Sequence, residues 1–266
     1  MIISHEYRYL FVEVPHAGTA AVSQELCANY AGHRVLQQHS HHFEFLRCAT
    51  PEEKTYFVFS GVRNPLDEAV RIYLNYKHTA PASLARNDDG VSLSNLRRYA
   101  FIRNNKADFG TYFKKFYQLP YTSLGSLSHQ YSNYVLRFES LQEDFSTLLD
   151  LLGIGQRRPL PTASNTADFL SYYTPEVIGQ ARWVFGPFME RWNYAFPTEW
   201  GSDSVHWMSH AEFHVLEELR TFYWKRLKRK SNVAAERTGV SSEFVREELL
   251  PQPVSLRNSC GTLDGS

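Results

Sequence analysis

The sequence has little cysteine and no excess of charge of either sign. Its 266 residues include three cysteines, Cys27, Cys48 and Cys260, at unrelated spacings. An odd number without a paired spacing argues against a disulfide framework and against a cysteine-rich zinc site. The 28 Lys and Arg side chains equal the 28 Asp and Glu side chains. A protein that neutralises nucleic-acid phosphates usually carries a basic excess, so we expect no nucleic-acid partner.

Long apolar runs are also missing. No window reaches the roughly 18 apolar residues that are needed to span a bilayer. The first residues lack the cationic region, apolar run and small-residue cleavage site of a signal peptide. We therefore expect a cytoplasmic protein with no membrane partner. The hydrophobic fraction of 43%, with 15% aromatic residues, is enough to supply the core of a globular domain.

Three apolar and aromatic runs alternate with segments of helical spacing. Residues 9–14, 56–62 and 134–138 have the composition of buried strands. Asn64 and Pro65 after the second run predict the start of a helix, because they suit the N-cap and the first helical position. This alternation predicts an α/β fold, a three-layer sandwich with a mainly parallel sheet.

Composition also divides the chain. We expect one α/β domain over residues 1–200 and a C-terminal helical extension of it over residues 201–230. The polar segment over residues 231–266 is expected to be a flexible tail. Aromatic residues at helical spacing between Phe109 and Tyr117 are expected to belong to the core.

The turn over residues 15–21 (PHAGTAA) is the first candidate site. It follows the first predicted strand, and ligands in parallel sheets bind beyond the carboxyl ends of strands. Its small residues would let backbone N–H groups approach an anion at the start of the next helix. An ordinary tight turn is the alternative. No Walker motif is present, so a nucleoside triphosphatase has no support.

Arg63, at the end of the second predicted strand, is the second candidate. Its guanidinium could bind a phosphate with two parallel N–H groups. A surface pair between Arg63 and a carboxylate explains its presence equally well.

The segment HSHH at residues 39–42 is the third candidate. In an extended segment His39 and His41 would share one face. A histidine near its ordinary pKa can take the proton of a hydroxyl as a general base. The alternatives are solvent-exposed histidines and a metal site. No cysteine pair or H-E-x-x-H helix supplies further zinc ligands, so we expect no metal.

Three segments in this order, FVEVPHAGT, HSHHFEF and YFVFSGVRNPLDEAVRIYLNY, resemble one family. They are similar to the sulfotransferases that use 3′-phosphoadenosine-5′-phosphosulfate (PAPS), nearest the group of heparan sulfate 2-O-sulfotransferase and its bacterial relatives. The later segments VLRFESLQEDFSTLLDLLGI and YYTPEVIGQARWVFGPFMERWNYAF also look like family segments. The resemblance covers about residues 8–197 and implies a P-loop-like sulfotransferase fold.

The resemblance also implies roles for the candidate residues. In the family, the loop after the first strand holds the 5′-phosphosulfate, and the arginine after the second strand holds the 3′-phosphate. His41 would be the general base, with His39 orienting it or sharing the task, and His16 would stabilise the transferring sulfuryl group. The implied donor-binding residues are His16, Ala17, Gly18, Thr19, Ala20, Arg63 and Arg71.

The chain departs from the family pattern where the chemistry is expected. The departures are His16 for the loop lysine, Ala20 and Ala21 for hydroxyl residues, Glu68 for an arginine, Arg71 for the serine that binds the 3′-phosphate, and Pro187 for a common aspartate. A protonated imidazole could replace the lysine only below its own pKa, which predicts an acid-side pH optimum. Arg71 could bind the 3′-phosphate, or it could pair with Asp67 one helical turn away.

Three functions remain open at this point. The first is a sulfotransferase that moves a sulfuryl group from PAPS to an acceptor hydroxyl of a sugar or small metabolite, giving a sulfate ester and 3′,5′-ADP (PAP). The second is a sulfotransferase-like nucleotide-binding or interaction module without catalysis. The third is a metal-dependent hydrolase built on the histidines. The sequence also leaves a homo-oligomer open.

Overall fold

The computed structural model describes most of the chain up to residue 224. The described residues are 1–79, 86–87, 90–91, 93–121, 126–160, 168–201 and 204–224. The chain divides into two compact units, residues 1–221 and residues 222–266, and the first of these carries the elements below. The tail that we expect over residues 231–266 lies outside the described residues.

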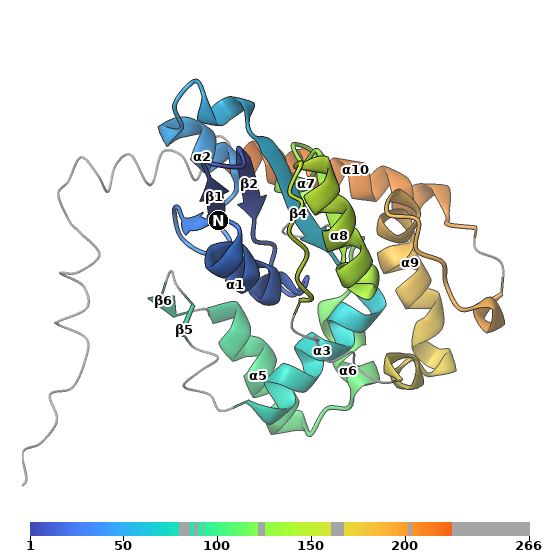
Figure 1. Ribbon diagram of the computed structural model, residues 1–266. Helices are drawn as coiled ribbons and strands as arrows, with labels where there is room; N and C mark the ends of the chain where they lie inside the picture. Colours follow the sequence, from blue (N-terminus) through green and yellow to red (C-terminus); the bar gives the residue numbers. More distant parts are fainter. Residues whose placement is uncertain are drawn as a thin grey trace, which may run out of the picture. The chain divides into compact units, whose positions relative to one another are not determined.

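A five-stranded sheet forms the centre of the first unit, with the strand order β3-β1-β2-β4-β7 (Figure 1). Its strands are β1 (Ile2–Ser4), β2 (Tyr9–Val12), β3 (His33–Arg34), β4 (Phe57–Val62) and β7 (Tyr134–Arg137). Neighbours β2, β4 and β7 run parallel, whereas β1 pairs antiparallel with both β2 and β3. The sheet is therefore mixed, and the expectation of a mainly parallel sheet holds only for its β2-β4-β7 part.

The antiparallel part has a simple cause. A short turn over residues 5–8 joins β1 to β2, and a connection that short permits only antiparallel pairing. Two further short strands, β5 (Arg86–Asn87) and β6 (Gly90–Val91), form a separate antiparallel pair.

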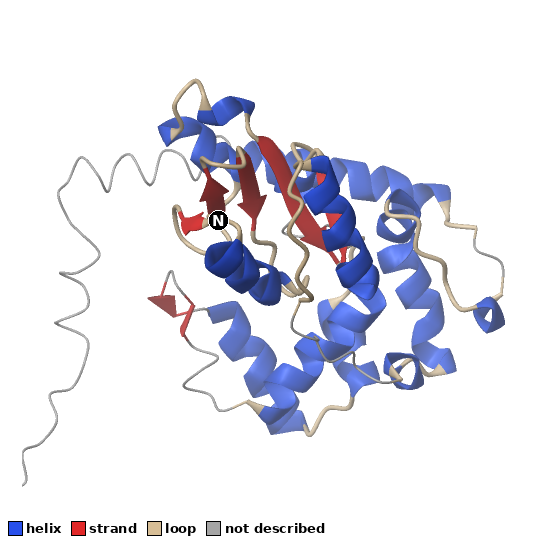
Figure 2. Cartoon of the chain, viewed as in Figure 1, coloured by secondary structure: helices blue, strands red, loops and turns tan. Residues whose placement is uncertain are grey.

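Helices surround the sheet (Figure 2). In chain order they are α1 (Thr19–Asn29), α2 (His42–Cys48), α3 (Pro65–His78), α5 (Leu93–Asn105), α6 (Phe109–Phe116), α7 (Ser126–His129), α8 (Leu141–Leu151), α9 (Pro175–Arg191) and α10 (Trp207–Phe222). Across the described part of the chain, no helix is long and apolar enough to cross a membrane.

Successive side chains of β2 pack against different helices on the two faces of the sheet. Tyr9 and Phe11 pack in one cluster with α1 and α8, whereas Leu10 and Val12 pack in another with Phe45 of α2. Successive side chains of a strand point to opposite faces, so helices cover both faces of the sheet. The α/β class and the covered sheet that the sequence predicts are confirmed.

The start of α3 follows the prediction closely. Asn64 caps the helix, since its side-chain oxygen accepts a hydrogen bond from the Leu66 N–H at 2.9 Å, and Pro65 occupies the first turn. Ser140 and Glu143 have the spacing of a capping box at the start of α8, but the Ser140 side chain makes no capping bond.

The aromatic run between Phe109 and Tyr117 lies in the core, as its spacing predicts. Tyr112 and Phe113 of α6 are fully buried and pack in one cluster with residues of α3 and α9. This cluster holds α3 against the rest of the unit, and the first turn of α3 brings Asp67 to Arg63, which follows β4.

Candidate functional site

The loop between β2 and α1 has an unusual backbone. His16 and Gly18 have φ values of 63° and 71°, and Ala17 between them does not have a positive φ. A backbone that alternates in hand turns successive N–H groups toward one side, which is the geometry of an anion-binding nest. Gly18 is the N-cap of α1, and no side chain caps this helix. The loop and the helix start therefore present backbone donors together.

Two glycine contacts fix the position of this loop. A Cβ on Gly61 of β4 would stand 3.2 Å from the Ala17 carbonyl oxygen and 3.4 Å from Thr19 Cγ2, so the loop lies directly on that strand. On its other side, a Cβ on Gly18 would stand 2.4 Å from a ring carbon of Phe138. The Thr19 hydroxyl donates to the Val14 carbonyl at 3.1 Å, so it is engaged inside the loop.

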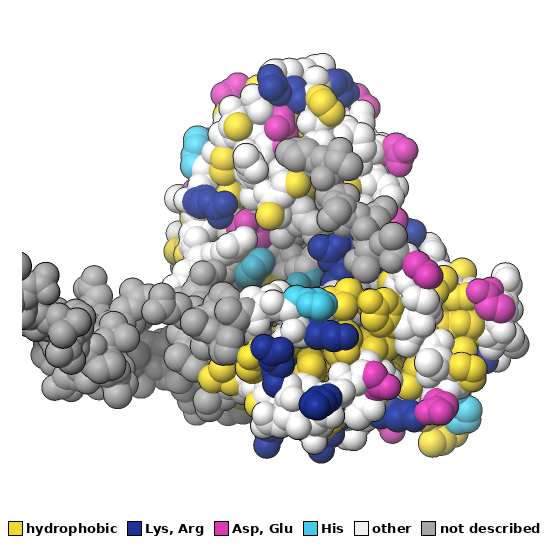
Figure 3. Space-filling view, turned by 90° about the horizontal axis from the view of Figure 1, so that it is seen from below, with side chains coloured by type: hydrophobic (Ala, Val, Ile, Leu, Met, Phe, Trp, Pro, Cys, Tyr) yellow, Lys and Arg dark blue, Asp and Glu magenta, His cyan; other side chains and the backbone are white. Residues whose placement is uncertain are grey.

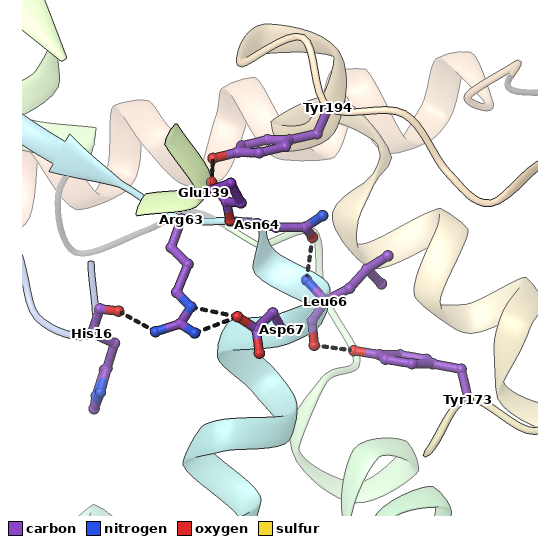
Figure 4. A network of polar contacts seen from close by, with 8 residues as sticks. All are labelled: His16, Arg63, Asn64, Leu66, Asp67, Glu139, Tyr173 and Tyr194. Atoms are coloured by element: carbon purple, nitrogen blue, oxygen red, sulfur yellow. Dashed lines mark hydrogen bonds and ion pairs between the residues drawn. The ribbon is translucent and has the colours of Figure 1, made fainter. Parts of the chain in front are cut away.

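Arg63 lies beside the loop, because β2 and β4 are parallel neighbours and their carboxyl ends meet. Its Nη1 donates to the His16 carbonyl at 3.5 Å, and its guanidinium stacks 3.7 Å from the centre of the Phe138 ring. Its Nε and Nη2 both donate to one oxygen of Asp67, with the Nε distance 2.7 Å (Figure 4). Arg63 and Asp67 form a buried ion pair.

This pairing bears on the sequence interpretation of Arg63 and shows one partner of Asp67. Arg63 does pair with a carboxylate, but the pair is buried and not on the surface. Asp67 bonds Arg63 four residues before it, whereas the sequence allowed a pair with Arg71 four residues after it. The other Asp67 oxygen, Oδ1, is buried and has no hydrogen-bond partner among the described residues.

His16 lies among positive groups. Its side chain reaches solvent, yet the surrounding protein removes hydration water and, together with the charges of His39, Arg63 and Arg71, lowers its pKa to about 4. The structure thus brings together four residues that the sequence selected. At pH 7 the His16 imidazole is therefore neutral and carries no positive charge.

The two histidines of the HSHH segment have different surroundings. The segment is not extended: residues 37–40 form a turn, His39 has a φ of 66°, and α2 begins at His42. The expectation that His39 and His41 share one face of an extended segment is therefore wrong.

His39 is exposed, and the residue that follows β2 holds its ring. Its Nδ1 lies 2.9 Å from the Glu13 carbonyl oxygen. A carbonyl only accepts hydrogen bonds, so Nδ1 is the donor, and in the neutral tautomer that makes this bond Nε2 has the lone pair. His41 is buried, stacks on Phe43 with ring centres 5.4 Å apart and serves as the N-cap of α2. The position that suits a base is therefore that of His39.

Glu13 is a residue that the sequence prediction missed. Its carboxylate is buried, accepts from Ser23 Oγ at 2.5 Å and lies 3.6 Å from Arg34. An acidic residue inside the apolar run YLFVEV was the signal available in the sequence. Buried carboxylates need such partners, and here they also fix the strand end that orients His39.

Glu68 is an acidic residue in the first turn of α3. Burial raises the pKa of its carboxyl group to about 7, although a hydrogen bond from Tyr121 and the charge of Arg63 oppose that rise. Glu68 and Arg71 both lie on α3, three residues apart.

A second network fixes the start of α3 from the other side (Figure 4). The Asn64 N–H donates to Glu139 Oε1 at 2.7 Å, and the Tyr194 hydroxyl donates to Glu139 Oε2 at 2.8 Å. The Tyr173 hydroxyl donates to the Leu66 carbonyl at 2.9 Å. These bonds join segments distant in sequence, so no local pattern could have predicted them.

The same region offers cations but no metal centre. In the space-filling view, histidine side chains and Lys or Arg side chains lie next to one another near the middle of the face shown in Figure 3. Within the described ranges, no group of three or more His, Cys, Asp or Glu side chains could hold a metal ion. The chemistry available there is that of backbone amides, guanidinium groups and imidazoles.

Comparisons with protein-family models, with curated proteins and with solved structures found no match for this chain.

Proposed function

We propose that this protein is a PAPS-dependent sulfotransferase that moves a sulfuryl group to an acceptor hydroxyl of a sugar or small metabolite. The observation that carries the proposal is that the loop after β2 lies next to the segment after β4. The alternating backbone at His16–Gly18 and the guanidinium of Arg63 lie side by side, joined by the bond from Arg63 to the His16 carbonyl. PAPS carries phosphate groups at the 3′ and 5′ positions of its ribose. These suit a site with two kinds of hydrogen-bond donor to anions, backbone amides and a guanidinium.

The donor would bind with its 5′-phosphosulfate on the backbone amides of residues 17–20. Those amides lie at the start of α1, where the helix dipole favours negative charge. Arg63 and Arg71 would hold the 3′-phosphate. Because Asp67 already takes two N–H groups of Arg63, the Nη1 side of that guanidinium and the side chain of Arg71 supply the donors in this proposal.

In the transfer step, His39 takes the part of general base. The acceptor oxygen forms a bond to sulfur while the bond from sulfur to the 5′-phosphate oxygen breaks, and PAP leaves. The acceptor proton passes to Nε2 of His39, whose Nδ1–H stays bonded to the Glu13 carbonyl. His41, which caps α2, holds the end of the histidine segment and acts as a positioning residue.

The neutral His16 favours a second function, a PAP-binding module without catalysis. With a pKa of about 4, this imidazole supplies no positive charge to the transferring sulfuryl group at pH 7. This candidate predicts that PAP binds while PAPS is never consumed in the presence of any acceptor.

A turnover assay separates these functions. The purified protein is incubated with PAPS and sets of sugars, phenols and small alcohols, and mass spectrometry detects the added sulfuryl group together with PAP. We expect transfer by the wild type and a loss of at least about 100-fold in His39→Ala, the usual size of a general-base effect. His33→Ala, which removes an exposed histidine on the edge strand β3, is the control. Full turnover by His39→Ala would contradict the assignment of the base.

A further inference from the structure

The helix α10 has two apolar faces, and its inner face anchors it to the first unit. Phe213 is buried in a cluster with Val62 and Phe188. Ser209 is also buried, and its hydroxyl donates to the Trp183 carbonyl at 2.6 Å. An ion pair between Arg191 and Glu217 adds a contact to α9. The helix is thus held without help from its outer side chains.

The outer face is a row of exposed apolar residues. Trp207, Val215 and Leu219 are 71%, 58% and 59% exposed, and Ala211 is also exposed. These four positions are spaced by four residues, so they form one inclined ridge on the helix surface, and Met208, 43% exposed, lies beside them. Contiguous apolar surface of this kind marks a site of interaction. We call these five residues the outer row.

We propose that the outer row binds the outer row of a second copy of this chain, with the two α10 helices antiparallel about a two-fold axis at Val215. Antiparallel pairing about that position sets Ala211 of one copy opposite Leu219 of the other, a small side chain against a large one, and sets Val215 opposite itself. A two-fold interface requires such self-complementary surfaces. The proposal does not depend on the proposed function.

The polar side chains beside the outer row fit a second copy. Glu218 and His214 are exposed and lie on the same flank of the row, four residues apart. In the antiparallel pair, Glu218 of one copy comes within about 3 Å of His214 of the other along the helix axis, given the rise of an α-helix. His210, on the same side of the helix, already lies 3.0 Å from Glu190.

An anionic lipid surface fits this face less well. Glu212 and Glu218 border the outer row on its two sides and are both exposed, so an anionic bilayer would face their charges.

The size of the interface sets the expected affinity of the dimer. A single helix face is a small interface, below the roughly 800 Å² per partner of a standard complex. We therefore expect a dimer that dissociates in the micromolar range.

Sedimentation velocity of the full chain at concentrations from about 1 to 100 µM tests the proposal at the affinity that a small interface predicts. The wild type should pass from monomer to dimer, and Val215→Lys, which sets two ammonium groups face to face, should weaken the dimer at least about tenfold. The matched control is Leu119→Lys, an equally exposed leucine outside α10. A monomer throughout, a dimer unaffected by Val215→Lys, or a monomer that binds anionic vesicles through the outer row would overturn it.

A disulfide cross-link tests how the two α10 helices are oriented in the dimer. In a background with Cys27, Cys48 and Cys260 changed to serine, Val215→Cys should form a disulfide between the two copies on mild oxidation. Peptide mass spectrometry identifies the 215–215 link, and Leu119→Cys should give none. A dimer in which position 215 never cross-links would rule out the axis at Val215.

Discussion

At the scale of the residue, His16 determines how the candidate site depends on pH. Its imidazole lies near Arg63, Arg71 and His39, and loss of hydration together with these positive groups lowers its pKa to about 4. A bound anion reverses the sign of the local field, which favours the imidazolium form. The protonation of His16 and the binding of PAP are therefore thermodynamically linked.

This linkage predicts that PAP binds more tightly as the pH falls. In the free protein His16 gains its proton only near pH 4, whereas in the complex its pKa is higher, so binding takes up a proton between these two values. Calorimetric titrations from pH 5 to pH 8, in buffers of different ionisation enthalpy, measure this uptake. His16→Asn lacks it and corrects for the titration of PAP itself. Equal proton uptake by both proteins would contradict the linkage.

Glu68 affects stability through its own titration. Its pKa in the unfolded chain is near 4.5, and burial raises it to about 7 in the fold. Since the folded pKa is the higher one, the stability that the protonated group contributes is present below pH 4.5 and is lost as the pH rises through 7.

We therefore expect Glu68→Gln to stabilise the protein at pH 8.5 by about 3 kcal/mol, from roughly 1.4 kcal/mol for each pKa unit. The amide keeps an acceptor for Tyr121 and carries no charge to bury. Urea unfolding at pH 5 and pH 8.5 measures the gain, which should fall to about 1 kcal/mol or less at the lower pH. Glu143→Gln, at an exposed position of α8, is the matched control. A loss of stability at pH 8.5 would show that the Glu68 charge is needed.

At the scale of the element, the site is set by two parallel strands and the loops that follow them. Much of this could be predicted: the apolar runs predict β2 and β4, and Asn64 with Pro65 predicts the start of α3. Parallel neighbours then bring their carboxyl ends together. Sequence alone could not choose the partner of Asp67, because residues 63 and 71 are both four positions away, and only the end of β4 decides between them.

The histidine segment shows a second limit of sequence reasoning. Alternation predicts a shared face only in an extended chain, and the turn at residues 37–40 depends on the contact of His39 with the Glu13 carbonyl from another element. Contacts of this kind leave no periodic signal. The antiparallel strands β1 and β3, three and two residues long, are likewise too short to predict from composition.

Gly18 is the position where the loop tolerates least change. Its φ of 71° favours glycine, and a Cβ there would lie 2.4 Å from a Phe138 ring carbon. Gly153 has nearly the same φ, 70°, with nothing within 4 Å of an added Cβ. Gly153→Ala should therefore lose only the backbone cost of about 1 kcal/mol. Gly18→Ala should lose about 2 kcal/mol more, because the ring must also move.

Chemical denaturation of the two variants beside the wild type measures both losses. Their difference isolates the contact of the loop with Phe138 from the cost of the backbone conformation. Equal losses in the two variants would mean that the loop does not pack against that ring.

At the scale of the whole molecule, a chain of zero net charge gathers two guanidinium and two imidazole groups at the carboxyl ends of its parallel strands. His16, His39, Arg63 and Arg71 come from three separate segments, and the parallel pairing of β2 with β4 brings two of these segments together. Such a local field, within a neutral molecule, suits a small polyanionic ligand and not an extended one.

The central claim is that this end of the sheet binds the 3′-phosphate of PAP. Titration of the full-length protein with PAP and with ADP, which lacks that phosphate, tests it most directly. We predict that PAP binds at least about tenfold more tightly than ADP, as one charge-assisted phosphate contact provides. Arg71→Ala should lose the preference, and Arg8→Ala, at the opposite end of β2, should keep it. Equal affinity of the wild type for PAP and ADP would contradict the claim.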